Sequence, residues 1–191
     1  QLVAQGFCRI IICVGFLQNQ VIQYVSSRND CQILFSSEDV PLGTAGAIKN
    51  AEVSIKSEQF LVLNGDSFCK VDLEGLLGFH IENSAVVTIA IAESNDSQDY
   101  GSICLGDNGK VISNFNEKTL RNSTYINAGI YCMNKSILSR IPAGKKTSLE
   151  YDIFPDLDEK IFFGYLTHSL LTDIGTPQRY LNANENPEAF S

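Results

Sequence analysis

A short apolar run, Phe60–Leu63, ends abruptly in the polar residues Asn64, Gly65 and Asp66. An apolar run without polar interruption predicts a strand buried on both faces. In an open α/β sheet ligands bind beyond the carboxyl ends of the strands, so the Asp66 carboxylate is well placed to hold a metal or a phosphate-bearing ligand. Gly65 would let the backbone approach that ligand. The alternative, that Asp66 only caps a turn, stays open.

The order of the predicted elements indicates an α/β fold. Strands and helices alternate up to Asp66, which favours a largely parallel sheet in this part of the chain. The predicted strands here are Arg9–Val14, Cys31–Phe35 and Phe60–Leu63, and the predicted helices are Gln18–Val25 and a segment within Pro41–Ala51.

Beyond Asp66 several strand-like runs follow one another with turns between them, which favours antiparallel additions to the sheet. These runs are Ala85–Ala92, Ser102–Leu105, Lys110–Phe115 and Tyr125–Met133. A further strand is predicted at Ile161–Thr167, and helices at Leu73–His80, Lys135–Ile141, Ser148–Leu157 and Pro177–Asn184.

The length of 191 residues suits one domain, 1–191. A net charge of -8 without any basic run argues against a nucleic-acid polymer as partner. The longest apolar run, Ile10–Leu17, is too short to cross a bilayer, so no membrane association is predicted. The 6 cysteines are scattered and form no CxxC pair, which favours a reducing, cytoplasmic location.

A second carboxylate, Asp173, has a setting like that of Asp66. A strand-like segment ends there and is followed by Gly175, Thr176 and Pro177, a sequence suited to the start of a helix. Two carboxylates at the mouths of two strands could hold one Mg²⁺, which prefers oxygen ligands and shares the phosphate oxygens of its substrate. The alternative, two unrelated turn residues, is not excluded by the spacing.

Three other segments offer polar groups to a ligand. Gly43 and Thr44 stand where a helix begins, and backbone N–H groups there can bind an anion or a base edge, although an ordinary strand-to-helix connection fits the segment better in isolation. The pair Glu117 and Lys118 could bind a sugar phosphate, or be exposed charge. Asn127 and Gly129 could contact a sugar, or form a bulge.

The order of these motifs resembles the sugar-phosphate nucleotidyltransferase family. The motifs are PLGTAGA, LNGD, DYG at Asp99–Gly101, FNEK at Phe115–Lys118, INAGIY at Ile126–Tyr131 and DIGTP at Asp173–Pro177. The segment SLEYDIFP at Ser148–Pro155 is most similar to the branch that acts on D-glycero-D-manno-heptose 1-phosphate with GTP, followed by the enzymes for mannose or glucose 1-phosphate. The resemblance implies a Rossmann-like, three-layer α/β/α fold with a mixed, mostly parallel sheet.

The resemblance also implies an activity and its residues. A sugar 1-phosphate would attack the α-phosphorus of a nucleoside triphosphate and release pyrophosphate, with Mg²⁺ as cofactor and the oligomeric state open to a homo-oligomer. Matched residue by residue, the implied metal ligands and catalytic residues are Asp66 and Asp173, the implied nucleotide contacts are Leu42, Gly43, Thr44 and Gly65, and the implied sugar-phosphate contacts are Gly101, Glu117, Lys118, Asn127 and Gly129.

The chain departs from the family pattern at its beginning. The family's first strand, its Gly-rich phosphate loop and a downstream Pro-Lys segment are not found in it, and the only methionine is Met133. We therefore expect an N-terminal truncation at Gln1, and expect residues 1–191 expressed alone to be poorly stable and inactive. The alternative is a non-catalytic regulatory subunit that binds a nucleotide-sugar.

Overall fold

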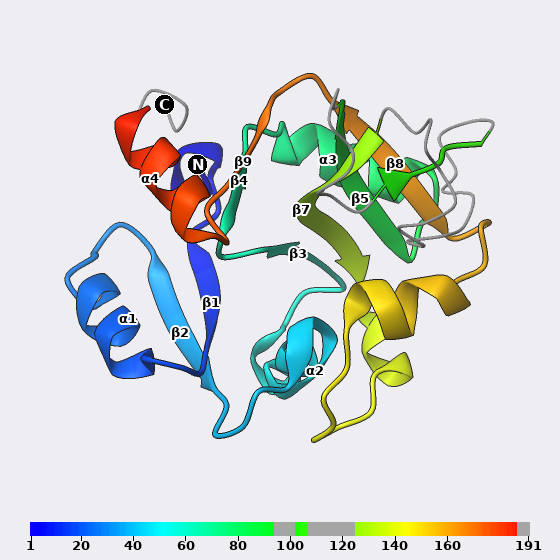
Figure 1. Ribbon diagram of the computed structural model, residues 1–191. Helices are drawn as coiled ribbons and strands as arrows, with labels where there is room; N and C mark the ends of the chain where they lie inside the picture. The colour runs from blue at the N-terminus through cyan, green and yellow to red at the C-terminus, as the bar shows by residue number, and fades with distance from the viewer. Residues whose placement is uncertain (94–101, 107–124, 187–191) are drawn as a thin grey trace. The chain divides into compact units, whose positions relative to one another are not determined.

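The computed structural model describes residues 1–93, 102–106 and 125–186, shown in Figure 1. The chain divides into two compact units. Unit 1 comprises Gln1–Glu58 and Lys135–Asp156, and unit 2 comprises Gln59–Asn134 and Leu157–Ser191. Whether the two act as one domain stays a prediction.

Unit 1 is built on two parallel strands, β1 (Arg9–Val14) and β2 (Gln32–Ser37). Parallel neighbours need a crossover connection, which the helix α1 (Gln18–Val25) supplies. These three predicted elements are confirmed. The unit continues with the helix α2 (Gly43–Asn50) and with short helical turns η1 (Val3–Gln5), η2 (Glu52–Ser54), η4 (Lys135–Arg140), η5 (Leu149–Ile153) and η6 (Phe154–Asp156).

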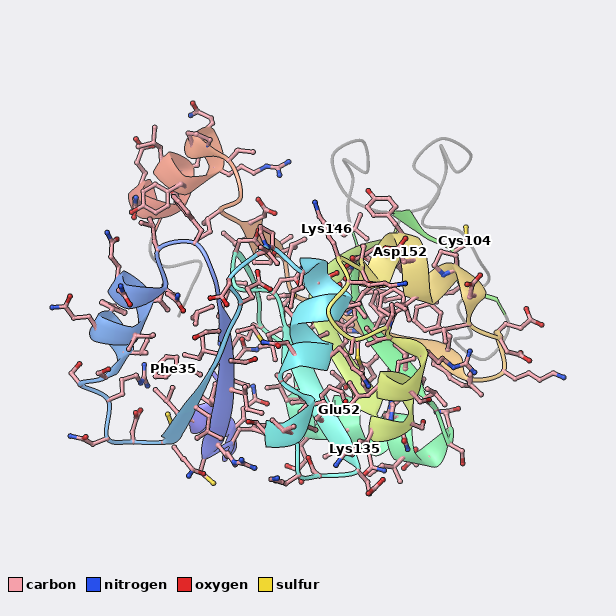
Figure 2. All side chains as sticks on the ribbon, turned by 90° about the horizontal axis from the view of Figure 1, so that it is seen from below. Phe35, Glu52, Cys104, Lys135, Lys146 and Asp152 are labelled. Carbon is pink, nitrogen blue, oxygen red and sulfur yellow. The ribbon has the colours of Figure 1, made fainter. Side chains whose placement is uncertain are left out.

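Two lysines join the segments of unit 1 that lie far apart in the sequence. The ammonium group of Lys49 donates to the Leu138 carbonyl at 2.9 Å and pairs with Glu52 at 2.7 Å. The ammonium group of Lys135 donates to the Ile55 carbonyl at 3.0 Å, and Figure 2 labels Glu52 and Lys135 in this part of the unit. Charge-assisted hydrogen bonds of this kind fasten the returning segment to α2 and the turn after it.

Unit 2 contains a five-stranded mixed sheet and a two-stranded sheet. In the larger sheet β7 pairs antiparallel with β3, β5 and β6, whereas β8 pairs parallel with β5. The strands are β3 (Gln59–Leu63), β5 (Val87–Glu93), β6 (Ser102–Ile103), β7 (Tyr125–Asn134) and β8 (Phe162–Thr167). The smaller sheet pairs β4 (Ser67–Cys69) antiparallel with β9 (Leu171–Asp173), and the helices are α3 (Leu73–Glu82) and α4 (Pro177–Glu185).

The mixed character of the sheet is confirmed, but the prediction of mostly parallel pairing is wrong for the described strands. The strand β7 lies between β3 and β5 and runs against both of them. Its sequence correctly predicts an antiparallel strand, but not its central position, because pairing partners this far apart leave no local pattern. The three-layer arrangement concerns both units together and stays a prediction.

The prediction that Phe60–Leu63 is buried on both faces is also wrong in this structure. Every residue of β3 is half-buried, and of β1 only Val14 is buried. Among the described strands β3 pairs only with β7 and β1 only with β2, so each lies at an edge of its sheet. A strand at an edge has neighbours on one side only and is covered less completely than a central strand.

The core of unit 2 forms where α3 packs on the central strands. Val87, Ile89 and Ile91 of β5 are fully enclosed, as are Leu73 and Leu76 of α3. Full burial of an aliphatic side chain of this size contributes about 1.5–3 kcal/mol. The helix begins at Asp72, whose carboxylate accepts a hydrogen bond from the Gly75 N–H at 3.0 Å, a cap that contributes about 1 kcal/mol.

All 6 cysteines are free thiols in the structure. Cys132 lies in the centre of β7, and burial raises the pKa of its thiol to about 12, so it is unreactive at neutral pH. Over the stretches of chain that the structure describes, no helix has both the length and the apolar character needed to span a membrane.

His80 connects α3 to the sheet inside this core. Its side chain is 1% exposed, and its Nδ1 forms a hydrogen bond of 2.9 Å with the Thr88 hydroxyl of β5. Its Nε2 has no hydrogen-bond partner among the described residues. Burial disfavours the charged form and lowers the pKa of the imidazole below its ordinary value of 6.5.

The lowered pKa predicts a loss of stability in mild acid. The unfolded chain binds a proton at His80 more readily than the folded chain, so the free energy of unfolding should fall as the pH drops below 6.5. Replacing both partners, His80→Leu with Thr88→Val, leaves no unpaired hydroxyl and should flatten this dependence. Urea unfolding between pH 7.5 and 5.5 measures it, and equal slopes in both proteins would contradict the assignment.

Candidate active site

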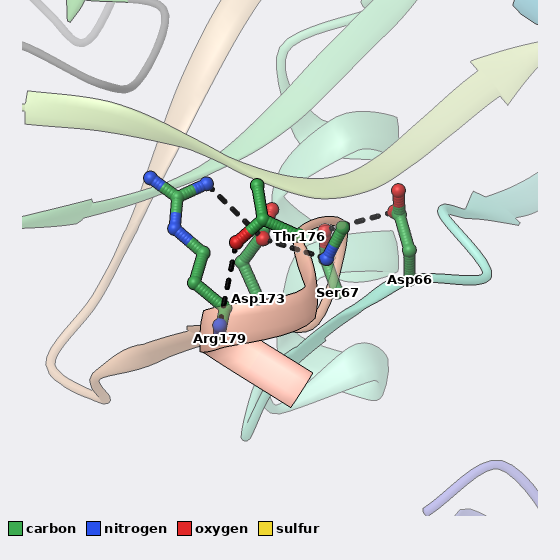
Figure 3. A network of polar contacts seen from close by, with 6 residues as sticks. Asp66, Ser67, Asp173, Thr176 and Arg179 are labelled. Carbon is green, nitrogen blue, oxygen red and sulfur yellow. Dashed lines mark hydrogen bonds and ion pairs between the residues drawn. The ribbon is translucent and has the colours of Figure 1, made fainter. Parts of the chain in front are cut away.

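The pairing of β4 with β9 brings the two predicted carboxylates to neighbouring positions. Asp66 immediately precedes β4 and Asp173 is the last residue of β9. Ser67 lies opposite Asp173 in the register, and the Ile174 N–H donates to the Asp66 carbonyl at 2.8 Å. Figure 3 shows both side chains in one polar network. The predicted convergence of these two strand ends is therefore observed.

Each carboxylate accepts hydrogen bonds through its Oδ1, and both carboxylates lie beside Gly175. Oδ1 of Asp66 accepts from the Ser67 hydroxyl at 3.2 Å, and Oδ1 of Asp173 accepts from the Gly175 N–H at 2.9 Å. A Cβ on Gly175 would lie 3.4 Å from Oδ2 of Asp66, and 3.4 Å and 3.8 Å from Oδ1 and Oδ2 of Asp173. Neither Oδ2 atom accepts a hydrogen bond within the described part of the chain. Because Gly175 has no side chain, it places no atom at this position beside the two carboxylates.

Of the two alternatives that the sequence leaves open for Asp173, the structure shows the turn residue, and metal binding stays a prediction. The hydrogen bond to the Gly175 N–H is that of a turn residue, but it occupies only Oδ1. Across residues 1–93, 102–106 and 125–186 no three His, Cys, Asp or Glu side chains gather as a metal site. Two carboxylate oxygens fit Mg²⁺, because that ion takes one or two protein carboxylates and completes its shell with waters and substrate phosphates.

Arg179 is a member of this network that the sequence analysis did not identify. Its Nη1 donates to Oδ1 of Asp173 at 3.2 Å, and the two side chains are 27% and 17% exposed. Thr176 caps α4 by accepting from the Arg179 N–H at 3.3 Å, so the arginine lies in the first turn of the helix. The helix dipole disfavours a cation in this turn. An arginine at the start of a predicted helix was therefore the feature of the sequence that indicated a nearby acidic partner.

The predicted nucleotide-binding turn is held against another segment of unit 1. The Thr147 carbonyl accepts from the N–H groups of Ala45 at 3.0 Å and of Gly46 at 3.2 Å, so these two donors at the start of α2 are not available to an anion. Gly43 has a φ of +72°, and a Cβ there would lie 2.6 Å from the Thr147 oxygen. The glycine is therefore required by backbone packing alone.

Thr44 completes this docking. Its hydroxyl accepts from the Leu149 N–H at 2.8 Å and donates to Oε2 of Glu150 at 3.1 Å. The Leu42 carbonyl accepts from the Thr147 N–H at 2.8 Å. Hydrogen bonds to residues of the same unit thus hold Leu42, Gly43 and Thr44 in place. Their contact with a nucleotide stays a prediction.

The predicted sugar contacts Asn127 and Gly129 form a bulge in β7, the alternative stated for the glycine. The register of β5 against β7 shifts between Ile89 and Ile91. Gly129 has a φ of +70°, and its N–H donates to Oδ1 of Asn127 at 2.8 Å. The Asn127 amide donates to the Tyr131 hydroxyl at 2.8 Å. Both polar ends of Asn127 therefore have partners within β7, and a sugar contact stays a prediction.

Of the remaining predicted site residues, the structure describes Gly65 but not the other three. Gly65 follows β3, and a Cβ built there meets nothing within 4 Å, so the backbone is open to a ligand. Gly101, Glu117 and Lys118 lie outside the described residues. The structure thus brings together Asp66 and Asp173. The predicted contacts of Glu117 and Lys118 with the sugar phosphate stay untested.

The sequence of the chain matches a known protein family over nearly its whole length. A family model described as Nucleotidyl transferase matches residues 1–189 of the 191. The chain belongs to the nucleotidyl transferase family. Of the solved structures, HddC from Yersinia pseudotuberculosis superimposes on this nucleotidyl transferase with a TM-score of 0.84 and 32% identity, covering 97% of this chain and 81% of that one. The same protein complexed with GMP-PN gives a TM-score of 0.83 at 31% identity.

Two relatives in sequence are guanylyltransferases named for different sugar phosphates. The D-glycero-alpha-D-manno-heptose 1-phosphate guanylyltransferase of Aneurinibacillus thermoaerophilus is 32% identical over 97% of this nucleotidyl transferase and 81% of its own length. The mannose-1-phosphate guanylyltransferase of Mycobacterium tuberculosis (strain ATCC 25618 / H37Rv) is 35% identical over 80% of the chain and 44% of its own length. The chain thus spans about half the length of the mannose-1-phosphate relatives, 44% to 56%.

The backbone packing of Gly43 predicts the effect of adding one methyl group. Gly43→Ala should lower the free energy of unfolding by about 2–4 kcal/mol, because left-handed strain adds to a collision with the Thr147 carbonyl. Gly144→Ala is the matched control, since Gly144 has a φ of +68° but open space around its Cβ position, and should cost only about 1–2 kcal/mol. Urea unfolding measures both, and equal losses would exclude the collision.

Proposed function

We propose that this protein transfers GMP from GTP to a heptose 1-phosphate, giving GDP-heptose and pyrophosphate. The observation that carries the proposal is that Oδ2 of Asp66 and Oδ2 of Asp173 lie 3.4 Å and 3.8 Å from the Cβ position of Gly175, in a chain of the nucleotidyl transferase family. The relative named for heptose 1-phosphate supports this substrate, because it aligns over 97% of the chain. The GMP-PN complex of HddC, TM-score 0.83, supports a guanine nucleotide.

In the proposed reaction a phosphate oxygen of the sugar 1-phosphate attacks the α-phosphorus of GTP. The new bond joins that oxygen to phosphorus, and the bond to the β-phosphate oxygen breaks, so that pyrophosphate leaves with the electron pair. No covalent nucleophile from the chain is needed, and catalysis depends on positioning and on neutralising charge. Asp66 and Asp173 would hold Mg²⁺ through their Oδ2 atoms, and the ion would neutralise phosphate oxygens.

The other contacts of the two substrates belong to the same proposal. Leu42, Gly43, Thr44 and Gly65 would bind the nucleotide, and the sugar phosphate would be bound by Gly101, Glu117, Lys118, Asn127 and Gly129. Free thiols throughout the chain agree with a cytoplasmic enzyme. A second candidate substrate is mannose 1-phosphate, which the 35% identity to the Mycobacterium tuberculosis enzyme favours.

A substrate panel tests the proposal directly. The protein expressed from its complete gene is supplied with Mg²⁺, one of GTP, ATP, UTP or dTTP, and one of heptose, mannose or glucose 1-phosphate. Pyrophosphate release and the nucleotide-sugar formed are measured together. We expect the highest kcat/KM with GTP and heptose 1-phosphate. A higher value with mannose 1-phosphate would select the second candidate, and no product from any pair would reject the activity.

The two carboxylates should be needed for turnover and not for folding. Asp66→Asn and Asp173→Asn in the complete protein should each lower kcat roughly a hundredfold, or about 3 kcal/mol in the activation barrier, as for other lost charge-stabilising contacts. The amide oxygen of each variant can still accept the hydrogen bonds that Oδ1 accepts now, from Ser67 in the first and from Gly175 and Arg179 in the second. Circular dichroism controls for folding, and near wild-type turnover in either variant would remove that residue from the site.

The position that a side chain at Gly175 would occupy should be needed for metal binding. Gly175→Ala places a methyl group 3.4 Å from Oδ2 of Asp66, an ordinary contact that the fold tolerates but that fills the space between the carboxylates. We expect Mn²⁺ affinity, measured by calorimetry, to fall at least about tenfold while the thermal midpoint changes little. The control is Gly78→Ala, which adds the same methyl group on α3 where nothing lies within 4 Å. Unchanged affinity in Gly175→Ala would place the metal elsewhere.

A further inference from the structure

Arg179 places a positive charge on one of the two carboxylates proposed to hold the metal. Its guanidinium donates to Oδ1 of Asp173 at 3.2 Å. Both side chains are largely withdrawn from water, with 27% and 17% of their surfaces exposed, so this ion pair is screened less than one at the open surface. Figure 3 shows the guanidinium directed at Asp173 from α4.

The position of Arg179 along α4 makes this ion pair informative. The first turn of a helix carries a partial positive charge and disfavours cations. α4 has no acidic residue in its first turn to offset Arg179, and Asp173, three residues before the cap Thr176, supplies a compensating charge. The chain therefore keeps a cation where helix electrostatics alone would disfavour one.

A divalent cation at Oδ2 and the guanidinium at Oδ1 would share one carboxylate. Their mutual repulsion over a few ångströms weakens both interactions, because the single negative charge of Asp173 cannot neutralise both cations. The two remaining partners of these carboxylates, the Ser67 hydroxyl and the Gly175 N–H, carry no charge and do not oppose a metal. Among the described residues that bond these oxygens, Arg179 is the one whose charge competes with the metal.

We propose that Arg179 is a positioning residue that acts as an internal counter-ion for Asp173 and competes with the divalent cation for it. Arg179 holds the carboxylate in place in the metal-free protein and keeps the intrinsic metal affinity low. Tight metal binding then requires the phosphate oxygens of a bound nucleotide as further ligands, which couples metal uptake to substrate binding. This inference rests on the proposed metal site of Asp66 and Asp173.

Titration with Mn²⁺ alone, with no nucleotide present, tests the competition. Free Mn²⁺ is measured by electron paramagnetic resonance for the wild type, Arg179→Gln, Arg179→Lys and Asp173→Asn. We expect Arg179→Gln to bind Mn²⁺ about fivefold more tightly, the size expected for removing a partly screened charge. Arg179→Lys keeps the charge and should stay within about twofold of the wild type, whereas Asp173→Asn should lose binding.

The matched control removes a positive charge from the opposite edge of the same unit. Lys160 precedes β8, whereas Asp66 follows β3, and these two strands run in the same direction, so the two residues lie at opposite edges of the sheet. Lys160→Gln should change the affinity for Mn²⁺ by less than about twofold. A larger effect of Lys160→Gln, as large as that of Arg179→Gln, would show a general charge effect and overturn the proposal.

A second readout excludes a merely structural role. Without metal Arg179→Gln should lower the thermal midpoint slightly, and a saturating concentration of Mn²⁺ should raise the midpoint more in this variant than in the wild type. Unchanged or weaker Mn²⁺ binding by Arg179→Gln, with binding lost in Asp173→Asn, would overturn the counter-ion role and leave the metal site standing. No Mn²⁺ binding by the wild type or by Arg179→Gln, with or without GTP, would remove the proposed metal site and this inference together.

Discussion

The backbone pairing of β7 with strands that run against it organises unit 2. β7 pairs with β3 on one side and with β5 on the other, and β5 pairs with β8 in parallel. As a consequence β3, β5 and β8 run in one direction, and their carboxyl ends meet at one edge of the sheet. Asp66 follows β3 at this edge, and the chain that leaves β8 leads to Asp173.

The short sheet of β4 and β9 then brings Asp66 and Asp173 to neighbouring positions. Its backbone hydrogen bonds put Asp173 opposite Ser67, next to Asp66, although more than a hundred residues separate the two along the chain. Two carboxylates this close repel each other in the absence of a cation. The Gly175 N–H, the Ser67 hydroxyl and the Arg179 guanidinium offset part of that repulsion, and only the guanidinium does so with a full charge.

The glycines of the predicted binding motifs show that a glycine in such a motif can be required for packing alone. Gly43 is required because the Thr147 carbonyl lies where its side chain would be, and Gly129 because β7 bulges against Asn64. Neither position needs a ligand to explain it. Gly175 differs, because the atoms nearest to its missing side chain are oxygens of two carboxylates, and such a space suits a cation better than packing.

The sequence by itself determined the local elements and the chemistry of the strand ends. Apolar runs and turn residues predict β1, α1 and the strand that ends before Asp66, because these patterns depend on neighbours in the chain. Motif order predicts the family. Tertiary structure alone decided that β7 lies between β3 and β5, that β3 is half-buried at an edge, and that Arg179 pairs with Asp173. These features depend on residues brought together across long stretches of chain, and the three-residue strand β4 that sets the site is too short to leave a periodic pattern.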